Sequence, residues 1–105
     1  MIIPNMNVKN IDKNELVSRY DAFVAVDTKG TILALYVYMS KAYLHVEETT
    51  RYFYTVFLAD GKVEPFYVDG DSNFFSEFGY DSIMLREVNR DSIHTDVTFD
   101  YVCES

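Results

Sequence analysis

The first candidate for a metal site in this chain is a run of residues with oxygen ligands at 69–73. Asp69-Gly70-Asp71-Ser72-Asn73 supplies the first, third and fifth ligand positions of a calcium-binding loop. The sixth position of such a loop needs glycine for a sharp turn, and the twelfth needs a bidentate glutamate. These positions are Phe74 and Tyr80 here, so a turn followed by a helix cap explains the run better than a calcium site.

Histidine and cysteine are scarce. His45 and His94 each precede a carboxylate, Glu47 or Asp96, by two residues, and alternate residues of a strand share a face. Each pair could hold a metal weakly, but a third and a fourth ligand are not evident. Cys103 is the only cysteine, which excludes an intrachain disulfide and a cysteine-based zinc cluster. The chain also lacks nucleophile motifs and phosphate-binding glycine loops, so we expect no metal, no cofactor and no enzymatic activity.

Residues 51–57 (RYFYTVF) have the aromatic content of an RNA-stacking strand. Tyr52 and Tyr54, however, stand where that motif has small residues. The net charge of −8 also opposes a polyanionic ligand. We therefore interpret this run as a central core strand.

The net charge comes from 17 acidic and 9 basic side chains among 105 residues. Residues 1–59 hold six acids and six bases, whereas residues 60–105 hold eleven acids and three bases. Aromatic residues make up 16% of the chain, which is too many for a disordered acidic protein. The charge therefore belongs to a folded surface, which disfavours bare nucleic acid and anionic membranes and favours a basic protein partner.

A single compact domain spanning residues 1–105 is expected at this length. Neither a signal peptide nor a membrane span is evident, which favours a cytoplasmic protein. Asp12 and Glu15 have the spacing of a helix N-cap and its N3 partner, so an N-terminal helix is predicted at residues 12–20. A helical turn is predicted at residues 72–78, capped by Asp71 or Ser72 and ended by Gly79.

Apolar alternation predicts that the rest of the chain is mainly β-strand. Glycine marks two hairpins, at Lys29-Gly30 and Asp60-Gly61, and Ser40-Lys41 is predicted to be a bulge within one long strand. Pro65 lacks an N–H and places its strand at a sheet edge. The expected fold is α+β, mainly an antiparallel sheet of about five to seven strands, curled or sandwich-like. The predicted strands are residues 22–28, 31–39, 42–47, 51–58, 62–68, 81–89 and 93–102.

Two of these strands, residues 31–39 and 51–58, are apolar on both faces. A strand of this kind must be covered on both sides, and one short helix covers only one. The second cover is a further sheet, a curl of the same sheet or another chain. A homodimer is therefore one structural hypothesis.

Acidic and aromatic residues alternate in the C-terminal part of the chain. In the strand predicted at residues 93–102, Asp96 and Asp100 point away from the apolar side. An acidic rim around exposed aromatic rings is typical of an interface that meets arginine and lysine. The predicted partner-binding residues are Asp69, Asp71, Glu77, Asp81, Asp91, Asp96, Asp100, Phe74, Phe75 and Tyr80.

These features favour a small non-enzymatic protein that inhibits or neutralises a basic partner, such as a nuclease or another nucleic-acid-binding protein. Its acids would stand where the partner expects phosphates. Immunity proteins against nuclease toxins and phage-encoded inhibitors of defence nucleases act in this way as classes, and the analogy is one of charge and size. One alternative is a structural homo-oligomer. The other is a ligand-binding or enzymatic domain with a pocket lined by Tyr36, Tyr38, Tyr43, Tyr52 and Tyr54.

Overall fold

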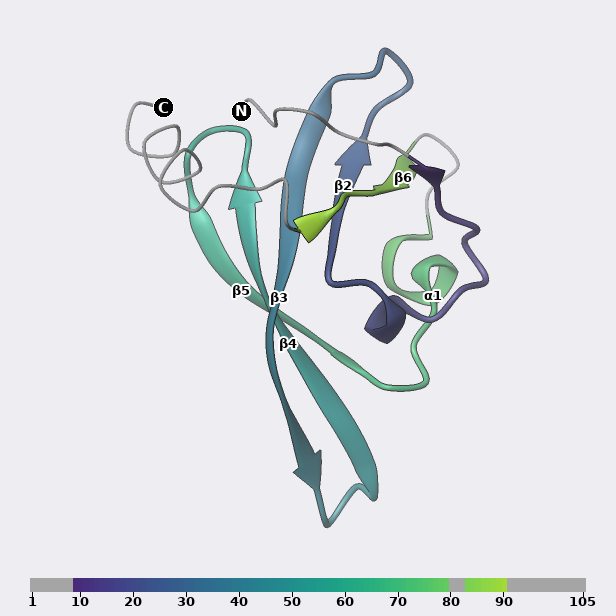
Figure 1. The fold of residues 1–105 in the computed structure, drawn as a ribbon, viewed down its shortest axis with the longest axis vertical. Helices are drawn as coiled ribbons and strands as arrows, with labels where there is room; N and C mark the ends of the chain where they lie inside the picture. Colours follow the sequence, from purple (N-terminus) through teal and green to yellow (C-terminus); the bar gives the residue numbers. More distant parts are fainter. Residues whose placement is uncertain (1–8, 80–82, 91–105) are drawn as a thin grey trace.

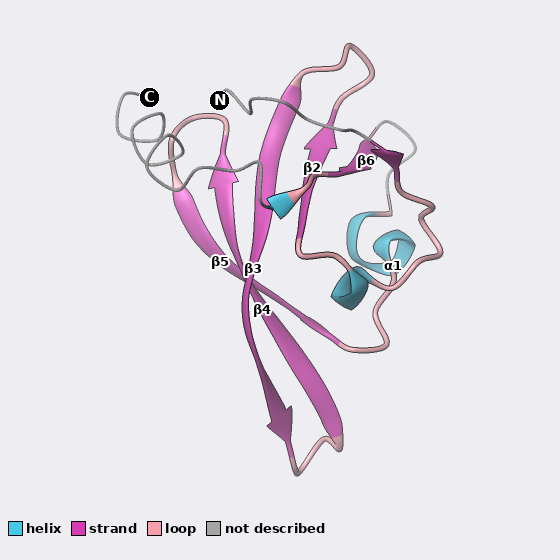
Figure 2. Cartoon of the chain, in the orientation of Figure 1, coloured by secondary structure: helices cyan, strands magenta, loops and turns pink. Residues whose placement is uncertain are grey.

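A sheet with helical elements on one face makes up the computed structural model, which describes residues 9–79 and 83–90 (Figure 1). Six strands are described, all paired antiparallel in the order β1-β6-β2-β3-β4-β5. They are β1 (Lys9–Asn10), β2 (Ala22–Val26), β3 (Ile32–Leu44), β4 (Thr49–Leu58), β5 (Val63–Asp69) and β6 (Met84–Glu87). The helical elements are the 3-10 turn η1 (Val17–Arg19) and helix α1 (Phe74–Phe78) (Figure 2). The predicted α+β class, mostly antiparallel sheet, is confirmed.

Both glycine-marked hairpins form as predicted. In the turn between β2 and β3, Asp27 Oδ1 accepts hydrogen bonds from the N–H groups of Lys29 and Thr31, each at 2.9 Å. Gly30 has a φ of 84°, and Gly61, between β4 and β5, has a φ of 90°. Residues other than glycine rarely adopt such angles. In place of the strand predicted at residues 81–89 the structure has the shorter strand β6. The strand predicted at 93–102 lies outside the described residues.

The strands predicted at residues 31–39 and 42–47 form one strand, β3, which ends at Leu44, so residues 45–47 belong to a turn instead. The bulge predicted at Ser40-Lys41 lies one residue earlier. The register with β4 shifts between Tyr38 and Ser40, so Met39 is the extra residue. Beyond the pairing of Arg51 with Asp69, β3 and β4 form a two-stranded arm, residues 43–50, that extends away from the rest of the sheet (Figure 1).

The N-terminal helix predicted at residues 12–20 is wrong. Asp12 Oδ1 accepts a hydrogen bond from the N–H of Asn14 at 2.9 Å, which closes a local turn instead of capping a helix. The N–H of Val17 donates to the carbonyl of Ser72 at 3.0 Å, so it is not available for a helical bond. Only the single turn η1 is helical in this segment.

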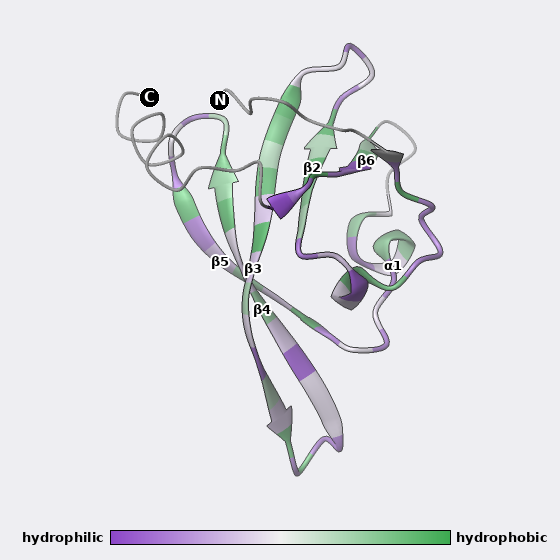
Figure 3. Ribbon diagram, in the orientation of Figure 1, coloured by the Kyte–Doolittle hydropathy of each residue, from purple (hydrophilic) through white to green (hydrophobic). Residues whose placement is uncertain are grey.

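One face of the sheet, here called the inner face, packs against η1 and α1. Phe23 on β2 stacks on Tyr36 with ring centres 4.6 Å apart, and Phe74 of α1 meets Phe23 edge-on at 4.9 Å. Because α1 has only five residues, its packing depends on two large rings, Phe74 and Phe78. The other buried side chains of this core are Ile11, Val17, Ala25, Tyr54, Val68 and Leu85. Hydrophobic residues are dense along β2 and the adjoining part of β3, which are interior strands (Figure 3).

Tyr54 attaches the segment around η1 to the sheet. The residue is 2% exposed, and its Oη lies 2.9 Å from the carbonyl oxygens of both Val17 and Tyr20. The buried hydroxyl therefore donates to the backbone of a segment that has little regular structure of its own. Tyr20 in turn donates a hydrogen bond from its Oη to Glu15, which fixes the loop before η1.

We predict that Tyr54→Phe lowers the free energy of unfolding by about 1–2 kcal/mol, because the carbonyls of Val17 and Tyr20 lose the hydroxyl proton that they share while the ring is kept. Urea denaturation measures the change. Tyr43→Phe is the matched control, since Tyr43 lies exposed on the arm and its hydroxyl should contribute nothing measurable. Equal stability of Tyr54→Phe and the native chain would show that the hydroxyl does not hold the segment around η1 against the sheet.

Stability should fall with rising pH above about 10, the ordinary pKa of tyrosine. Burial raises the pKa of Tyr54, and the nearby Asp21 adds to the effect. The folded chain therefore keeps its phenol protonated where the unfolded chain ionises, so the contribution is complete below pH 10 and is lost as pH rises. Denaturation measured from pH 8 to 11 should show that the free energy of unfolding declines less steeply with pH for Tyr54→Phe than for the native chain. An identical decline would contradict this origin.

Candidate protein-binding surfaces

Helix α1 is fixed at both ends by its flanking residues. Asn73 is the N-cap, with its Oδ1 accepting a hydrogen bond from the N–H of Ser76 at 2.7 Å. Gly79 ends the helix in the left-handed conformation, as predicted. The predicted caps, Asp71 and Ser72, are wrong, because it is Asn73 that has the extended backbone and makes the capping bond.

Two backbone hydrogen bonds fix which side of α1 faces the sheet. The N–H of Phe74 donates to the carbonyl of Glu15 at 3.1 Å, and the N–H of Phe75 donates to the carbonyl of Lys13 at 2.7 Å. Phe74 is fully buried against Phe23, whereas Phe75 is 56% exposed. The expectation that Phe74 lies on a partner-binding surface is therefore corrected, since its ring belongs to the core.

The exposed residues of this region include one phenylalanine and three carboxylates. Asp71, Phe75 and Glu77 are exposed on α1 and the loop before it, and Asp12 is exposed on the neighbouring loop. That loop is held next to α1 by the hydrogen bond between Lys13 and Phe75. We call Asp12, Asp71, Phe75 and Glu77 the α1 surface. An apolar ring with acidic neighbours suits contact with arginine or lysine.

Asp69 is engaged within the chain. Its Oδ1 accepts a hydrogen bond from Arg51 Nε at 2.9 Å, across the pair of strands β4 and β5. The Arg51 guanidinium also lies 4.6 Å from the centre of the Tyr67 ring. The hydrogen bond to Asp69 raises the pKa of Arg51. Asp69 binds Arg51 and Asn73 caps α1, so two oxygen ligands of the calcium-like run already make hydrogen bonds within the fold.

Tyr80, Asp81, Asp91, Asp96 and Asp100 lie outside the described residues. The described ranges contain twelve acidic and nine basic residues, a net charge of −3, out of the −8 of the whole chain. The remaining −5 comes from residues 80–82 and 91–105, which contain five acids and no lysine or arginine. Of the ten predicted partner-binding residues, Asp71, Phe75 and Glu77 are therefore the ones that the structure shows exposed, all three on α1 and the loop before it.

The histidines give no metal centre in the described residues. His45 is exposed beside the turn of the arm, with its ring 5.0 Å from that of Tyr43. Within residues 9–79 and 83–90, no three metal-ligating side chains cluster together. His94 and Cys103 lie outside the described residues.

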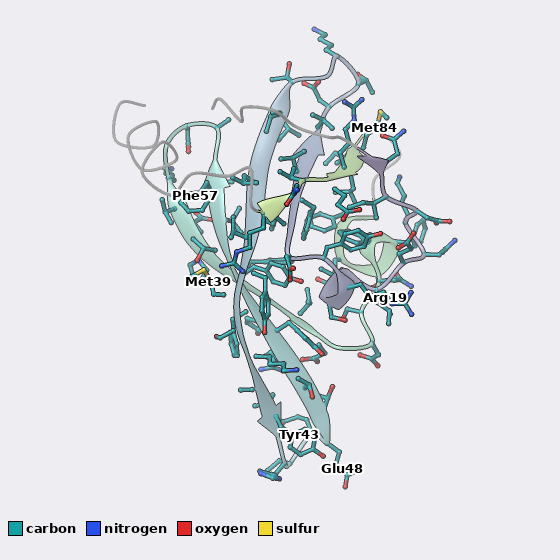
Figure 4. All side chains as sticks on the ribbon, viewed as in Figure 1. Arg19, Met39, Tyr43, Glu48, Phe57 and Met84 are labelled. Carbon is teal, nitrogen blue, oxygen red and sulfur yellow. The ribbon has the colours of Figure 1, made fainter. Side chains whose placement is uncertain are left out.

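Four of the five tyrosines predicted to line a pocket lie together in or against the inner core. Tyr54 is part of the inner core, and Tyr36, Tyr38 and Tyr52 pack against that core. Tyr43 lies on the arm and is 54% exposed (Figure 4). The prediction that residues 51–57 form a central core strand is confirmed, since β4 lies between β3 and β5 and buries Tyr54 on the inner face.

The opposite side of the sheet, here called the outer face, exposes several large apolar side chains. The strand register and the alternation of side chains place Val24, Leu35 and Phe57 on this face. Val24 and Leu35 are buried, and Phe57 is partly buried. In the sequence, this face is indicated by the strands predicted at residues 31–39 and 51–58, which are apolar on both sides. Its exposed members are Leu33, Met39, Val63, Tyr67 and Met84.

Comparisons of the chain with protein-family models, with curated proteins and with solved structures gave no match. Among the described residues, none of the helices combines the length and the apolar character that crossing a membrane requires. The surfaces themselves are therefore the basis for any functional proposal.

Strand β5 is the edge of the sheet, as Pro65 predicted. The N–H of Leu58 donates to the carbonyl of Lys62, and that of Gly70 to Thr50, each at 2.8 Å. These bonds fix the ladder so that even-numbered residues of β5 bond to β4 and odd-numbered residues face away from it. The missing N–H of Pro65 is therefore on the outward side, where it interrupts the edge that another strand would use.

We predict that Pro65→Val promotes self-association through β5, because it restores an outward N–H in the middle of the edge. Sedimentation velocity should show a concentration-dependent shift to larger species. Glu64→Val is the control, since it adds the same side chain where the N–H already faces β4. Equal association of the two variants would mean that the added apolar side chain, and not the edge N–H, is responsible.

Proposed function

We propose that this protein is a small non-enzymatic binding protein that docks on a basic surface of a partner protein and thereby inhibits or neutralises it. The observation that carries the proposal is the exposure of Phe75, next in sequence to the fully buried Phe74, in a short segment that also exposes Asp71 and Glu77. The loop and the helix around these side chains are fixed by the Asn73 cap and by backbone bonds to residues 13–17. A fixed ring loses little conformational entropy on binding.

The chemistry of the α1 surface favours arginine and lysine on the partner. An arginine guanidinium can stack on the face of Phe75, which contributes about 0.5–1 kcal/mol at an exposed site. Carboxylates at Asp12, Asp71 and Glu77 complement its charge and accelerate encounter. The whole chain has a net charge of −8, which adds long-range attraction to a basic protein and repels nucleic acid.

Proteins that handle nucleic acid are the partner class best matched to this chemistry. Their binding sites carry arginine and lysine spaced to meet phosphates, and carboxylates on a rigid loop can take the phosphates' place. A nuclease or another nucleic-acid-binding protein blocked in this way would lose access to its substrate. Direct binding of nucleic acid or of an anionic membrane by this chain is disfavoured.

The proposal is tested by capturing partners on the immobilised protein and then measuring affinity for the purified captured protein. We predict a basic partner whose affinity falls about tenfold or more for Phe75→Ala, as expected for an aromatic anchor. The pair Asp71→Asn and Glu77→Gln should weaken binding and reduce its dependence on salt.

Matched controls lie on the arm. Tyr43→Ala removes a ring with nearly the same exposure as Phe75, 54% against 56%, and Glu47→Gln with Glu48→Gln removes two exposed carboxylates. These variants should bind as the native chain does. A captured partner that is not basic, or one whose affinity responds to the arm variants and not to the α1 variants, would contradict the proposal.

A further inference from the structure

The outer face has a buried centre and an exposed rim. Val24 and Leu35, paired across β2 and β3, are 0% and 1% exposed, whereas Met39 and Tyr67 are more than half exposed. In the described part of the chain η1 and α1 both pack on the inner face. Side chains standing in the middle of a sheet face lose all contact with solvent only when a further layer lies over them.

On the same face one guanidinium N–H lacks an acceptor in the described part of the chain. Arg86 on β6 is paired with Val24 in the register, so its side chain belongs to the outer face. Its Nε is buried and has no hydrogen-bond acceptor among the described residues. A buried guanidinium N–H requires an acceptor, so the covering layer should bring carbonyl or carboxylate oxygens.

We propose that residues 93–102 of the same chain form this covering layer. Residues 91–105 follow Arg90, only two residues beyond Val88, whose N–H donates to the carbonyl of Ala22 at 3.1 Å. The segment therefore begins beside the buried centre. Ten extended residues span about 33 Å, while crossing from β2 to β5 takes about 14 Å, so the length is sufficient.

The pattern of this segment matches the outer face. Ile93, Val97, Phe99 and Tyr101 lie on one side of the alternation, with Asp96, Thr98 and Asp100 on the other. In an extended conformation one side would meet Leu35 and its neighbours while the carboxylates face away. The backbone carbonyls of such a segment would supply the acceptor that Arg86 Nε needs. The cover is independent of the basic partner proposed above.

Paramagnetic broadening in the full-length chain tests the cover. A nitroxide is attached at Thr98→Cys in a Cys103→Ser background, and methyl signals on the two faces are compared. The labelled chain should lose most of its signal at Leu33, Leu35 and Val63 on the outer face. Signals on the inner face, from Val17 and Val68, should be much less affected.

Two neighbouring substitutions provide the matched control. Phe99→Ser should release the segment and restore the signals of the outer face, whereas Asp100→Ser, on the other side of the predicted strand, should not. Mixing isotope-labelled chains with nitroxide-labelled chains separates contact within one molecule from contact between copies.

Three results would overturn the proposal. The first is broadening only in the mixed sample, which would make a second copy the cover. The second is broadening that favours the inner face. The third is a uniform weak effect that Phe99→Ser leaves unchanged, which would leave residues 1–8 or a foreign chain as the cover.

Discussion

The hydroxyl of Tyr54 is the interaction on which the inner layer depends. It donates to the carbonyls of Val17 and Tyr20 and so holds against the sheet a segment that contains only one turn of helix. That segment supplies the carbonyls of residues 13 and 15 that receive the N–H groups of Phe75 and Phe74. The orientation of α1, and with it the choice of which phenylalanine is buried, therefore follows from an anchor on β4 rather than from the helix itself.

A five-residue helix is too short to cover a six-stranded sheet with aliphatic side chains, and the composition reflects this. Rings from β3, from β4 and from α1 meet around Phe23 of β2, each ring contributing a large buried area. The same shortage of helix leaves the outer face dependent on some other layer. The two faces thus differ in kind, because the inner face is packed mainly with aromatic rings and the outer face has a buried aliphatic centre with an exposed rim.

Local rules predicted the parts of the fold that local forces determine. Gly30 and Gly61 located the hairpins, Pro65 located the edge, and Gly79 located the end of α1. The helix at residues 12–20 failed because its backbone bonds to residues 72–75, a partner that spacing alone does not reveal. For the same reason Phe74 and Phe75 looked equivalent in sequence, although the backbone bonds to residues 13 and 15 bury one and expose the other. The charge was predicted to concentrate in the C-terminal part, and most of it lies in segments outside the described residues.

The arm separates one part of the chain from both faces. Its strands pair only with each other beyond Asp69, and the turn of residues 45–48 includes Val46, which is 93% exposed, and Glu48, which has a positive φ of 53° (Figure 4). Strain or bulk added at such a turn is not transmitted to a packed core, because no core side chain rests on it. The peptide between Val46 and Glu47 is therefore a natural point for inserting an epitope or a fluorescent protein, which would report on binding while leaving the α1 surface and the sheet unaltered.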